Sequence, residues 1–383
     1  MSRLQQIAKL REELAAQRRE LVQQVTAMRE KTVATLPDMV ARAKETLEGK
    51  LAKVYLAQDS AEALRILGQL LKGQEQVARA SSVTLDEIGF DAAMAKRGIK
   101  VNLTRLEEIV QREMGLPACG HPHFPILDQP REVIEEGLRR FAGVGQAAAG
   151  RARDLESVGP AAAVKAQAVC TDSVAPVELK RLVSEKIKAA VVRSEFGITG
   201  LDCIVADHGS MVLAEDEGHL RAVSNLPYKH VAVAGMEQLA GSAEEAVALV
   251  QAASIFTAGR ITPTYISFIS GPSRTGDIEF RMAYGMHGPK EVHVILLDNG
   301  RQAMRERGAG SLLKCIDCGS CYESCAELAR SQGWKDVTLT AKGLALGVAQ
   351  ERLSRPQTKV KMSAFLCPVG LCAEEVARGL GQV

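Results

Sequence analysis

The sequence feature that most constrains this chain is a dense run of cysteines, KCIDCGSCYESC, at residues 314–325. Its spacing is C-x2-C-x2-C-x3-C, on Cys315, Cys318, Cys321 and Cys325. A tight loop with this spacing aims successive thiolates at one centre, as in bacterial ferredoxins, which bind cuboidal iron–sulfur clusters. Zinc sites more often use two separated C-x2-C pairs or add histidine. The pattern therefore predicts an iron–sulfur cluster, with zinc or structural thiols as the alternatives.

The residue that follows the fourth cysteine decides how many clusters to expect. In ferredoxin runs this cysteine is followed by proline, and in two-cluster proteins it binds the other cluster. Here Ala326 follows Cys325, and the Cys-Pro pair occurs downstream, at Cys367 and Pro368. If Cys367 closed a second run, the three other ligand positions would be non-cysteine residues, namely Gln357, Val360 and Ser363. The second run therefore lacks ligands of its own.

We accordingly predict one [4Fe–4S] cluster, bound by Cys315, Cys318, Cys321 and Cys367. The alternative uses Cys325 as the fourth ligand and leaves Cys367 as a reduced thiol. The isolated cysteines are interpreted as incidental or buried thiols, namely Cys119, Cys170 and Cys203.

Charge and hydropathy exclude several classes of protein. Lys and Arg total 48 against 46 Asp and Glu, so the net charge is only +2, which argues against a nucleic-acid-binding protein. No apolar run reaches the roughly 18 residues that cross a bilayer, and the charged N-terminal sequence does not resemble a secretory signal. We therefore expect a cytoplasmic protein without a membrane span. Thiols stay reduced in that compartment, so its nine cysteines favour metal binding over disulfides.

Apolar periodicity predicts an α/β fold in three segments. Residues 1–50 form an N-terminal helical segment, with a long polar helix over 2–34 that we interpret as a docking or dimerising helix. Short apolar runs alternate with helical ones over 51–300, which indicates a sheet covered by helices. Residues 301–383 form the cysteine-bearing segment. The Asp207-His208-Gly209 turn predicts a hairpin, and Ser242 is the expected N-cap of the helix that follows KHVAVAG.

A polar stretch over 269–301 is the candidate ligand site of the larger domain. The strand TYISFIS runs into GPSRTGDIE and then into the loop GMHGP, and open α/β sheets place ligands beyond the ends of their strands. Arginine and hydroxyl groups hold a carboxylate or phosphate, and carboxylates with histidine perform acid–base chemistry. The predicted ligand-binding residues are therefore Ser273, Arg274, Thr275, Asp277, Glu279 and His287. The alternative is an ion-pair network that only holds the loop in place.

Several long runs resemble the lactate-utilisation (LUD) family. They are FGITGLDCIVADHGSMVLAEDEG, LPYKHVAVAGMEQL, ISGPSRTGDIE, GMHGPKEVHVILLDNGR and the cysteine loop. A LUD domain followed by a ferredoxin-like segment is the order of the family's iron–sulfur subunit (lactate-utilisation protein B-like). That subunit typically has two cluster motifs, whereas the second is degraded here. The GPSRTGDIE and GMHGPKEVHVILLD runs look closer to the family's clusterless subunit.

The resemblance implies a LUD domain related to the ribose-5-phosphate isomerase/CoA-transferase-like class. It also implies an iron–sulfur electron-transfer subunit of a cytoplasmic complex that oxidises lactate, with a flavoprotein or iron–sulfur oxidase as partner. One cluster relays single electrons, so we expect the chain not to be catalytic by itself. The alternative function is a LUD-domain enzyme or binder of a CoA ester, sugar phosphate or hydroxy acid. Its cluster would then be structural or a redox sensor.

Overall fold

A parallel β-sheet forms the centre of the molecule in the computed structural model, which describes residues 3–117, 119–126, 129–144, 176–276, 282–334, 337–356 and 366–383. Within these ranges six strands pair in the order β1-β12-β7-β4-β2-β3, all of them parallel. Their bounds are β1 (Lys53–Ala57), β2 (Gln76–Arg79), β3 (Lys100–Leu103), β4 (Phe196–Thr199), β7 (Lys229–Gly235) and β12 (Glu291–Leu297).

The two central strands explain why the sheet is buried on both faces. KHVAVAG and EVHVILL are almost continuous apolar runs, as expected for parallel strands covered by helices. They pair in register from Lys229 opposite Glu291 to Gly235 opposite Leu297. Both strands therefore end at the same edge of the sheet, and the segments that follow them begin side by side.

A second, smaller sheet has the order β8-β5-β6-β9. Its strands are β5 (Cys203–Val205), β6 (Ser210–Glu215), β8 (Leu239–Ala240) and β9 (Tyr265–Ile269). The predicted hairpin is confirmed, because β5 and β6 are antiparallel and the turn over 206–209 joins them. Gly209 adopts a positive φ of 69° there. Beyond β9, β10 (Arg274–Gly276) and β11 (Met282–Tyr284) form a separate two-stranded ribbon.

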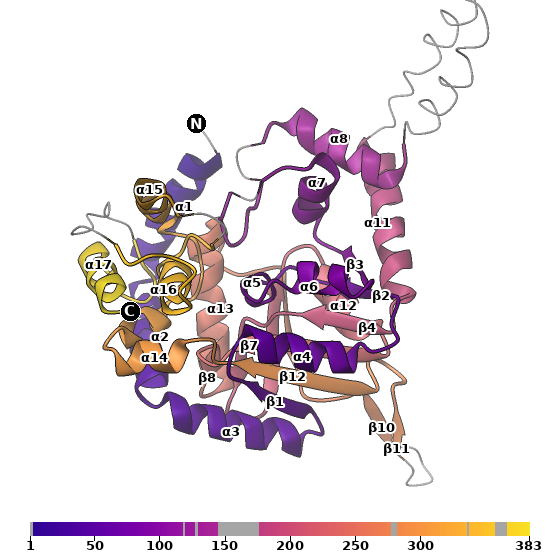
Figure 1. Cartoon of the computed structure of the whole chain (residues 1–383), viewed down its shortest axis with the longest axis horizontal. Helices are drawn as coiled ribbons and strands as arrows, with labels where there is room; N and C mark the ends of the chain where they lie inside the picture. The colour runs from indigo at the N-terminus through magenta and orange to yellow at the C-terminus, as the bar shows by residue number, and fades with distance from the viewer. Residues whose placement is uncertain are drawn as a thin grey trace, which may run out of the picture.

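Helices cover both faces of the central sheet (Figure 1). Their bounds before the cysteine run are α1 (Arg3–Gln17), α2 (Arg19–Ala34), α3 (Leu36–Gly49), α4 (Ser60–Leu70), α5 (Val83–Glu87), α6 (Phe90–Lys96), α7 (Leu106–Met114), α8 (Arg131–Ala142), α11 (Pro176–Val192), α12 (His219–Asn225), α13 (Ala243–Ala258) and α14 (Arg301–Glu306). Ser242 caps α13 as predicted, since its side chain accepts a hydrogen bond from the Glu245 amide. The run HLRAVSN forms helix α12.

The cysteine-bearing segment folds against the N-terminal helices and α14. It contains the 3-10 helix η1 (Gly310–Lys314), α15 (Tyr322–Gln332), α16 (Ala341–Ala349) and α17 (Ala373–Gln382). One continuous hydrophobic cluster includes Val25 and Met28 from α2, Leu312 from η1 and Leu344 from α16. The terminal segments therefore share one core with the second sheet, while a separate cluster fills the opposite face of the central sheet.

The N-terminal helices differ from the sequence-based interpretation. The expected single helix is divided near Arg18 into α1 and α2, and α2 is not an external docking helix. Val25 is fully buried and Met28 is 5% exposed, because α2 packs on α13 and η1. The apolar positions of α2 therefore belong to the core of the same chain.

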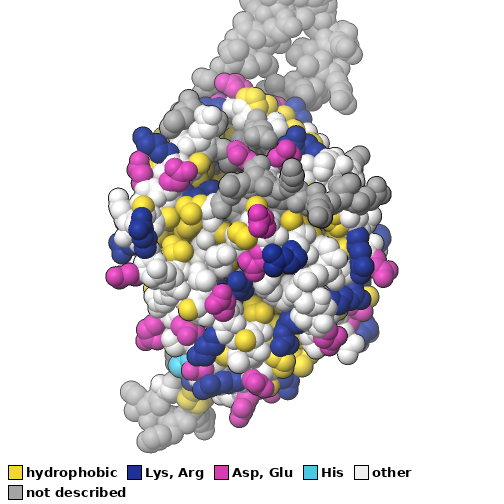
Figure 2. Space-filling view, turned by 90° about the vertical axis from the view of Figure 1, so that its left-hand side faces the viewer, with side chains coloured by type: hydrophobic (Ala, Val, Ile, Leu, Met, Phe, Trp, Pro, Cys, Tyr) yellow, Lys and Arg dark blue, Asp and Glu magenta, His cyan; other side chains and the backbone are white. Residues whose placement is uncertain are grey.

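Among the described residues, no helix is long and apolar enough to cross a membrane. The face that carries the cysteine-bearing segment, drawn in Figure 2, mixes Lys and Arg with Asp and Glu side chains. The described part of this face has no broad patch of only positive or only negative side chains, in agreement with the near-zero net charge.

Candidate metal centre

The cysteine loop, residues 315–321, is shaped by two residues with positive φ. Cys315 follows η1, and Cys321 is the N-cap residue of α15. Between them Asp317 has a φ of 53° and Gly319 a φ of 76°. This left-handed backbone, which favours glycine at the second position, turns the chain twice within seven residues. The turns bring the three thiols of the loop to one side.

Four thiols line one small cavity at this loop. Its lining includes Cys315, Cys318 and Cys321 from the loop and Cys367 from the downstream Cys-Pro pair. Burial raises the pKa of Cys367 to about 12, and the neighbouring Cys318 raises it further. Burial likewise raises the pKa of Cys318 to about 11. Such thiols become thiolates only when a metal group compensates their charge, so the donor set fits a buried cluster.

Cys325 occupies a different position. It lies one helical turn beyond Cys321 in α15, is fully buried, and is not among the lining residues of the four-thiol cavity. Its Sγ donates a weak hydrogen bond to Cys321 Sγ at 3.5 Å. This geometry favours Cys367 over Cys325 as the fourth ligand.

The remaining described cysteines are dispersed. Cys203 is buried in strand β5, and Cys119 Sγ donates to the carbonyl of Phe124. Cys372 is exposed at the start of α17, where its Sγ accepts a hydrogen bond from the Glu375 amide. Cys170 lies outside the described residues.

A single metal ion and a cubane cluster need different arrangements of four thiols. In the described part of the chain, no group of three or more His, Cys, Asp or Glu side chains is placed to hold one metal ion. A mononuclear zinc site needs its sulfurs about 2.3 Å from a common centre. A cubane cluster instead separates its four cysteine ligands, one on each iron.

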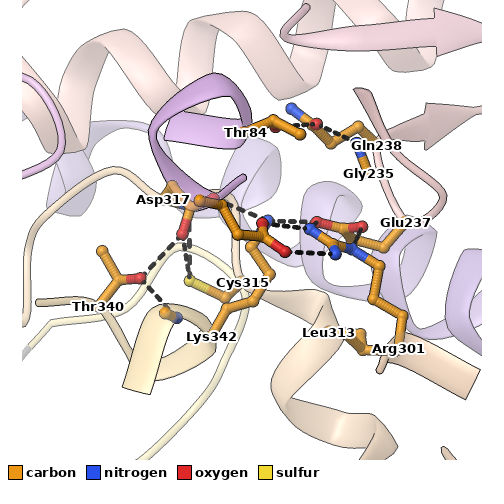
Figure 3. A network of polar contacts seen from close by, with 12 residues as sticks. Thr84, Gly235, Glu237, Gln238, Arg301, Leu313, Cys315, Asp317, Thr340 and Lys342 are labelled. Atoms are coloured by element: carbon orange, nitrogen blue, oxygen red, sulfur yellow. Dashed lines mark hydrogen bonds and ion pairs between the residues drawn. The ribbon is translucent and has the colours of Figure 1, made fainter. Parts of the chain in front are cut away.

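A buried polar network extends from the cysteine loop to the edge of the central sheet (Figure 3). Lys342 is at the start of α16, and its Nζ lies 2.7 Å from Asp317 Oδ2 and 2.5 Å from Glu237 Oε1. Glu237 also pairs with Arg301, which reaches Glu87 Oε2 at 2.9 Å. Asp317 Oδ1 accepts hydrogen bonds from Thr340 Oγ1 at 2.9 Å and, weakly, from Cys315 Sγ at 3.7 Å.

The charges in this network hold one another ionised. Burial alone would raise the pKa of Glu237, but Arg301 and Lys342 outweigh it and hold that pKa well below its usual range. Burial alone would lower the pKa of Lys342, but Asp317 and Glu237 raise it above normal. The residue that contacts Cys315 in this network, Asp317, is therefore paired with Lys342.

The HPHFP loop, residues 121–125, joins the sheet domain to the cysteine loop. His123 Nε2 lies 2.8 Å from the backbone oxygen of Asp317. Burial, reinforced by Arg105, lowers the pKa of His123 to about 4, so the neutral ring donates this hydrogen bond. The His121 ring lies 5.0 Å from the ring of Tyr322. These two histidines therefore support the cysteine loop.

Two larger cavities lie between the sheet and the cysteine loop. One, of about 280 Å³, is lined by Ser82 after β2, Gly200 after β4, and Cys315. The chain leaves these two strands in opposite directions across the sheet, and such switch points are where open α/β sheets bind ligands. The other, of about 1080 Å³, includes Arg79 and Tyr322. Acidic and basic side chains line both in similar numbers, so neither has the charge bias of a simple ion site.

The predicted ligand residues of 269–301 lie elsewhere. Ser273, Arg274 and Thr275 are on or beside the β10–β11 ribbon, which projects from the side opposite the cysteine-bearing segment (Figure 1). Arg274 and His287 are exposed, and the His287 amide donates to Ser273 Oγ at 3.1 Å. None of these four residues lines either large cavity. Asp277 and Glu279 lie outside the described residues.

Sequence reasoning missed the basic residues that approach the cysteine loop, above all Arg29. This side chain is 2% exposed in α2 and donates to the backbone oxygens of Leu313 and Lys314. A signal was present, because Arg29 shares the buried face of α2 with Val25 and Met28. A charged residue within an apolar stripe indicates a buried polar partner.

Comparison with known proteins supports the resemblance. Lactate utilization protein B of Macrococcus caseolyticus (strain JCSC5402) is 27% identical over 300 residues, which cover 78% of this chain and 56% of that protein. An uncharacterized electron transport protein of Escherichia coli (strain K12), YkgF, is 26% identical with the same two coverages. The chain thus spans little more than half the length of these curated relatives.

A solved DUF162 family protein from Deinococcus radiodurans aligns with 68% of this chain and 98% of its own, at 14% identity and a TM-score of 0.31. The family model for the LUD domain matches residues 40–297, from helix α3 to the end of β12. This match covers more than half of the sequence and includes the whole central sheet. The chain therefore belongs to the LUD domain family.

Proposed function

We propose that this chain is an iron–sulfur electron-transfer protein with one [4Fe–4S] cluster bound by Cys315, Cys318, Cys321 and Cys367. The observation that carries the proposal is the cavity that these four thiols share, although one of them is distant in sequence. Relatives named for lactate utilization and electron transport support it. When bound, such a cluster supplies one-electron transfer.

The surrounding residues suit a relay of electrons. The three predicted ligand cysteines of the loop are between 7% and 8% exposed, and Cys367 is half-buried, so the site is largely shielded from bulk water yet close to the surface. Asp317, held by Lys342 and Thr340, fixes the backbone between the first two ligands. The HPHFP loop fixes the same turn through the hydrogen bond of His123 to the Asp317 backbone oxygen. A rigid, dry surrounding limits the rearrangement that accompanies a change in charge.

Lactate oxidation is the pathway that the names of the relatives favour. Because a single cluster accepts one electron, a two-electron oxidation needs a partner flavoprotein or iron–sulfur oxidase. Affinity purification of the native complex, with identification of its subunits, tests this step. Recovery of the chain without any redox protein would contradict it.

Single substitutions test the ligand set. We expect the anaerobically purified wild-type chain to contain about four irons and four sulfides. Cys315→Ser and Cys367→Ser should lose most of that iron together with the charge-transfer absorption of the cluster. Cys325→Ser is the matched control and should retain both.

Loss of the cluster in Cys325→Ser with retention in Cys367→Ser would show that the fourth ligand is assigned wrongly. About eight irons in the wild-type chain, or none, would overturn the one-cluster proposal itself.

A further inference from the structure

The N-terminal helices hold both parts of the predicted ligand set. From α2, Thr26 Oγ1 donates to the backbone oxygen of Pro368 at 3.4 Å, beside Cys367. One turn later, Arg29 donates to Leu313 at 2.7 Å and to Lys314 at 3.2 Å, just before Cys315. Arg29 also reaches the backbone oxygen of Glu237 at 2.7 Å. Helix α2 therefore joins the downstream Cys-Pro pair, the cysteine loop and the edge of the sheet.

Helix α1 adds a second cation at the same loop. Arg11 Nη1 donates to the backbone oxygen of Ser320 at 3.5 Å, and its Nε is buried without a hydrogen bond in the described structure. Burial lowers the pKa of Arg11, while the thiols of Cys318 and Cys321 act in the opposite direction. The guanidinium is therefore close enough to two predicted ligands for their charges to interact.

These two arginines differ from an ordinary buried ion pair. The hydrogen bonds of Arg29 go to backbone carbonyls, and that of Arg11 also goes to a carbonyl. Their positive charges are thus held in position by the backbone rather than by direct contact with a carboxylate. A cluster with four thiolate ligands is an anion, and its reduction adds one further negative charge. Nearby fixed cations stabilise the reduced form more than the oxidised form.

We infer that Arg11 and Arg29 are positioning residues through which the N-terminal helices raise the reduction potential of the cluster. This inference rests on the proposed function and assigns these helices a role that a purely structural segment does not have. Arg29 also holds the two cysteine-bearing segments together, whereas Arg11 acts chiefly through its charge. Arg11 is therefore the better residue for the test.

The experiment is a potentiometric titration of the full-length protein with dithionite, followed by electron paramagnetic resonance. Arg11→Met should make reduction about tenfold less favourable, a shift of about 59 mV to more negative potential for a one-electron couple. Arg11→Lys keeps the charge and should stay close to wild type. Lys9→Met removes a charge from the exposed side of the same helix, where Lys9 pairs with Glu13, and should also leave the potential unchanged.

An unchanged potential in Arg11→Met, with a full complement of iron, would overturn the inference and leave the proposed function intact. An equal shift of the reduction potential in Lys9→Met would also overturn it. The shift would then depend on the net charge of the protein and not on the position of Arg11. If Arg11→Met did not retain iron, Arg11→Gln would decide, since it removes the charge but keeps a hydrogen-bond donor. A wild-type chain without a cluster would overturn the proposed function and this inference together.

Arg29→Lys provides a second test, which concerns the role of Arg29 in joining the two cysteine-bearing segments. It keeps the positive charge but cannot reproduce the forked contacts to Leu313, Lys314 and Glu237. We expect a potential near that of wild type in molecules that hold a cluster, with faster loss of iron to a chelator. A chelation rate equal to that of wild type would contradict the role of Arg29 in joining the two segments.

Discussion

His123 Nε2 donates a hydrogen bond to the backbone oxygen of Asp317, over a distance of 2.8 Å. This contact joins a loop of the sheet domain to the turn between the first two predicted ligands. A change that displaces the HPHFP loop should therefore also displace the cysteine loop, even where no cysteine is altered.

Gly319 offers a test of whether the position of the HPHFP loop matters to the cysteine loop. A Cβ atom added at Gly319 would lie 2.6 Å from His121 Nε2, and the residue has a φ of 76°. We expect Gly319→Ala to move the HPHFP loop and to lower the iron content of the purified protein by at least half. Gly333→Ala is the matched control, because Gly333 has a similar φ of 70° but nothing within 4 Å of the added atom.

Both variants introduce comparable backbone strain, of about 1 kcal/mol or slightly more. A comparison of iron content and visible spectrum between the two variants therefore separates the effect of the clash with His121 from that of the backbone strain. Equal iron loss in the two variants would show that the contact with His121 does not matter.

Arg301 should be essential to stability. It is 1% exposed and pairs with Glu87 and Glu237, so Arg301→Met leaves two buried carboxylates with one cation fewer. Breaking a buried pair by removing one partner typically costs about 3–5 kcal/mol. Urea unfolding followed by circular dichroism should show a decrease of that size in the free energy of unfolding.

Arg181→Met is the control for Arg301, because Arg181 forms ion pairs only on the exposed surface of α11. Its unfolding midpoint should match that of wild type, as expected for surface pairs. An Arg301→Met midpoint that also matches wild type would be inconsistent with a stabilising network.

His230 should make stability depend on pH. It is fully buried in β7, and burial, reinforced by His293, lowers its pKa from 6.5 to about 4. Above pH 6.5 the ring is neutral in both the folded and unfolded states. Between pH 6.5 and 4 the unfolded chain binds a proton that the folded chain does not, so stability decreases as the pH falls. The contribution of this ring is about 3 kcal/mol across that window.

Urea unfolding at pH 7.0, 5.5 and 4.5 measures this contribution. His230→Gln should lose less stability than wild type between pH 7.0 and 4.5, whatever its stability at pH 7.0. His208→Gln, which replaces an exposed histidine of the hairpin turn, is the matched control. Parallel profiles for wild type and His230→Gln would disprove the assignment.

The sequence was most informative where local chemistry decides the structure. Short apolar runs that alternate with helical ones predicted a sheet covered by helices, and a turn signal predicted the hairpin between β5 and β6. Both depend on residues adjacent in the chain. The predicted α/β class with an N-terminal helical segment, which also depended on local patterns, is confirmed. The cluster and its ligands stay predictions, although the structure brings Cys367 to the loop cysteines.

The ligand site predicted around Arg274 stays a prediction, and its place in the fold shows what local patterns do not reveal. The polar residues after TYISFIS resembled the end of a strand in an open sheet, but β9 belongs to the second sheet and leads into an exposed ribbon. Which sheet a strand joins depends on long-range pairing. The same holds for Arg29, whose hydrogen bond to Leu313 spans 284 positions. A local sequence pattern reveals neither the sheet that β9 joins nor the residues that Arg29 contacts.

The distance in sequence between Arg29 and the cysteine loop also affects how the chain matures. A ribosome releases α2 long before it has made residues 313–371, so the apolar face with Val25 and Met28 emerges without its final covering. With the proposed ligand set, a cluster could be completed only after Cys367 has been synthesised. A translation product that stops before η1 would leave this face partly uncovered, and we would expect quality-control proteases to remove it.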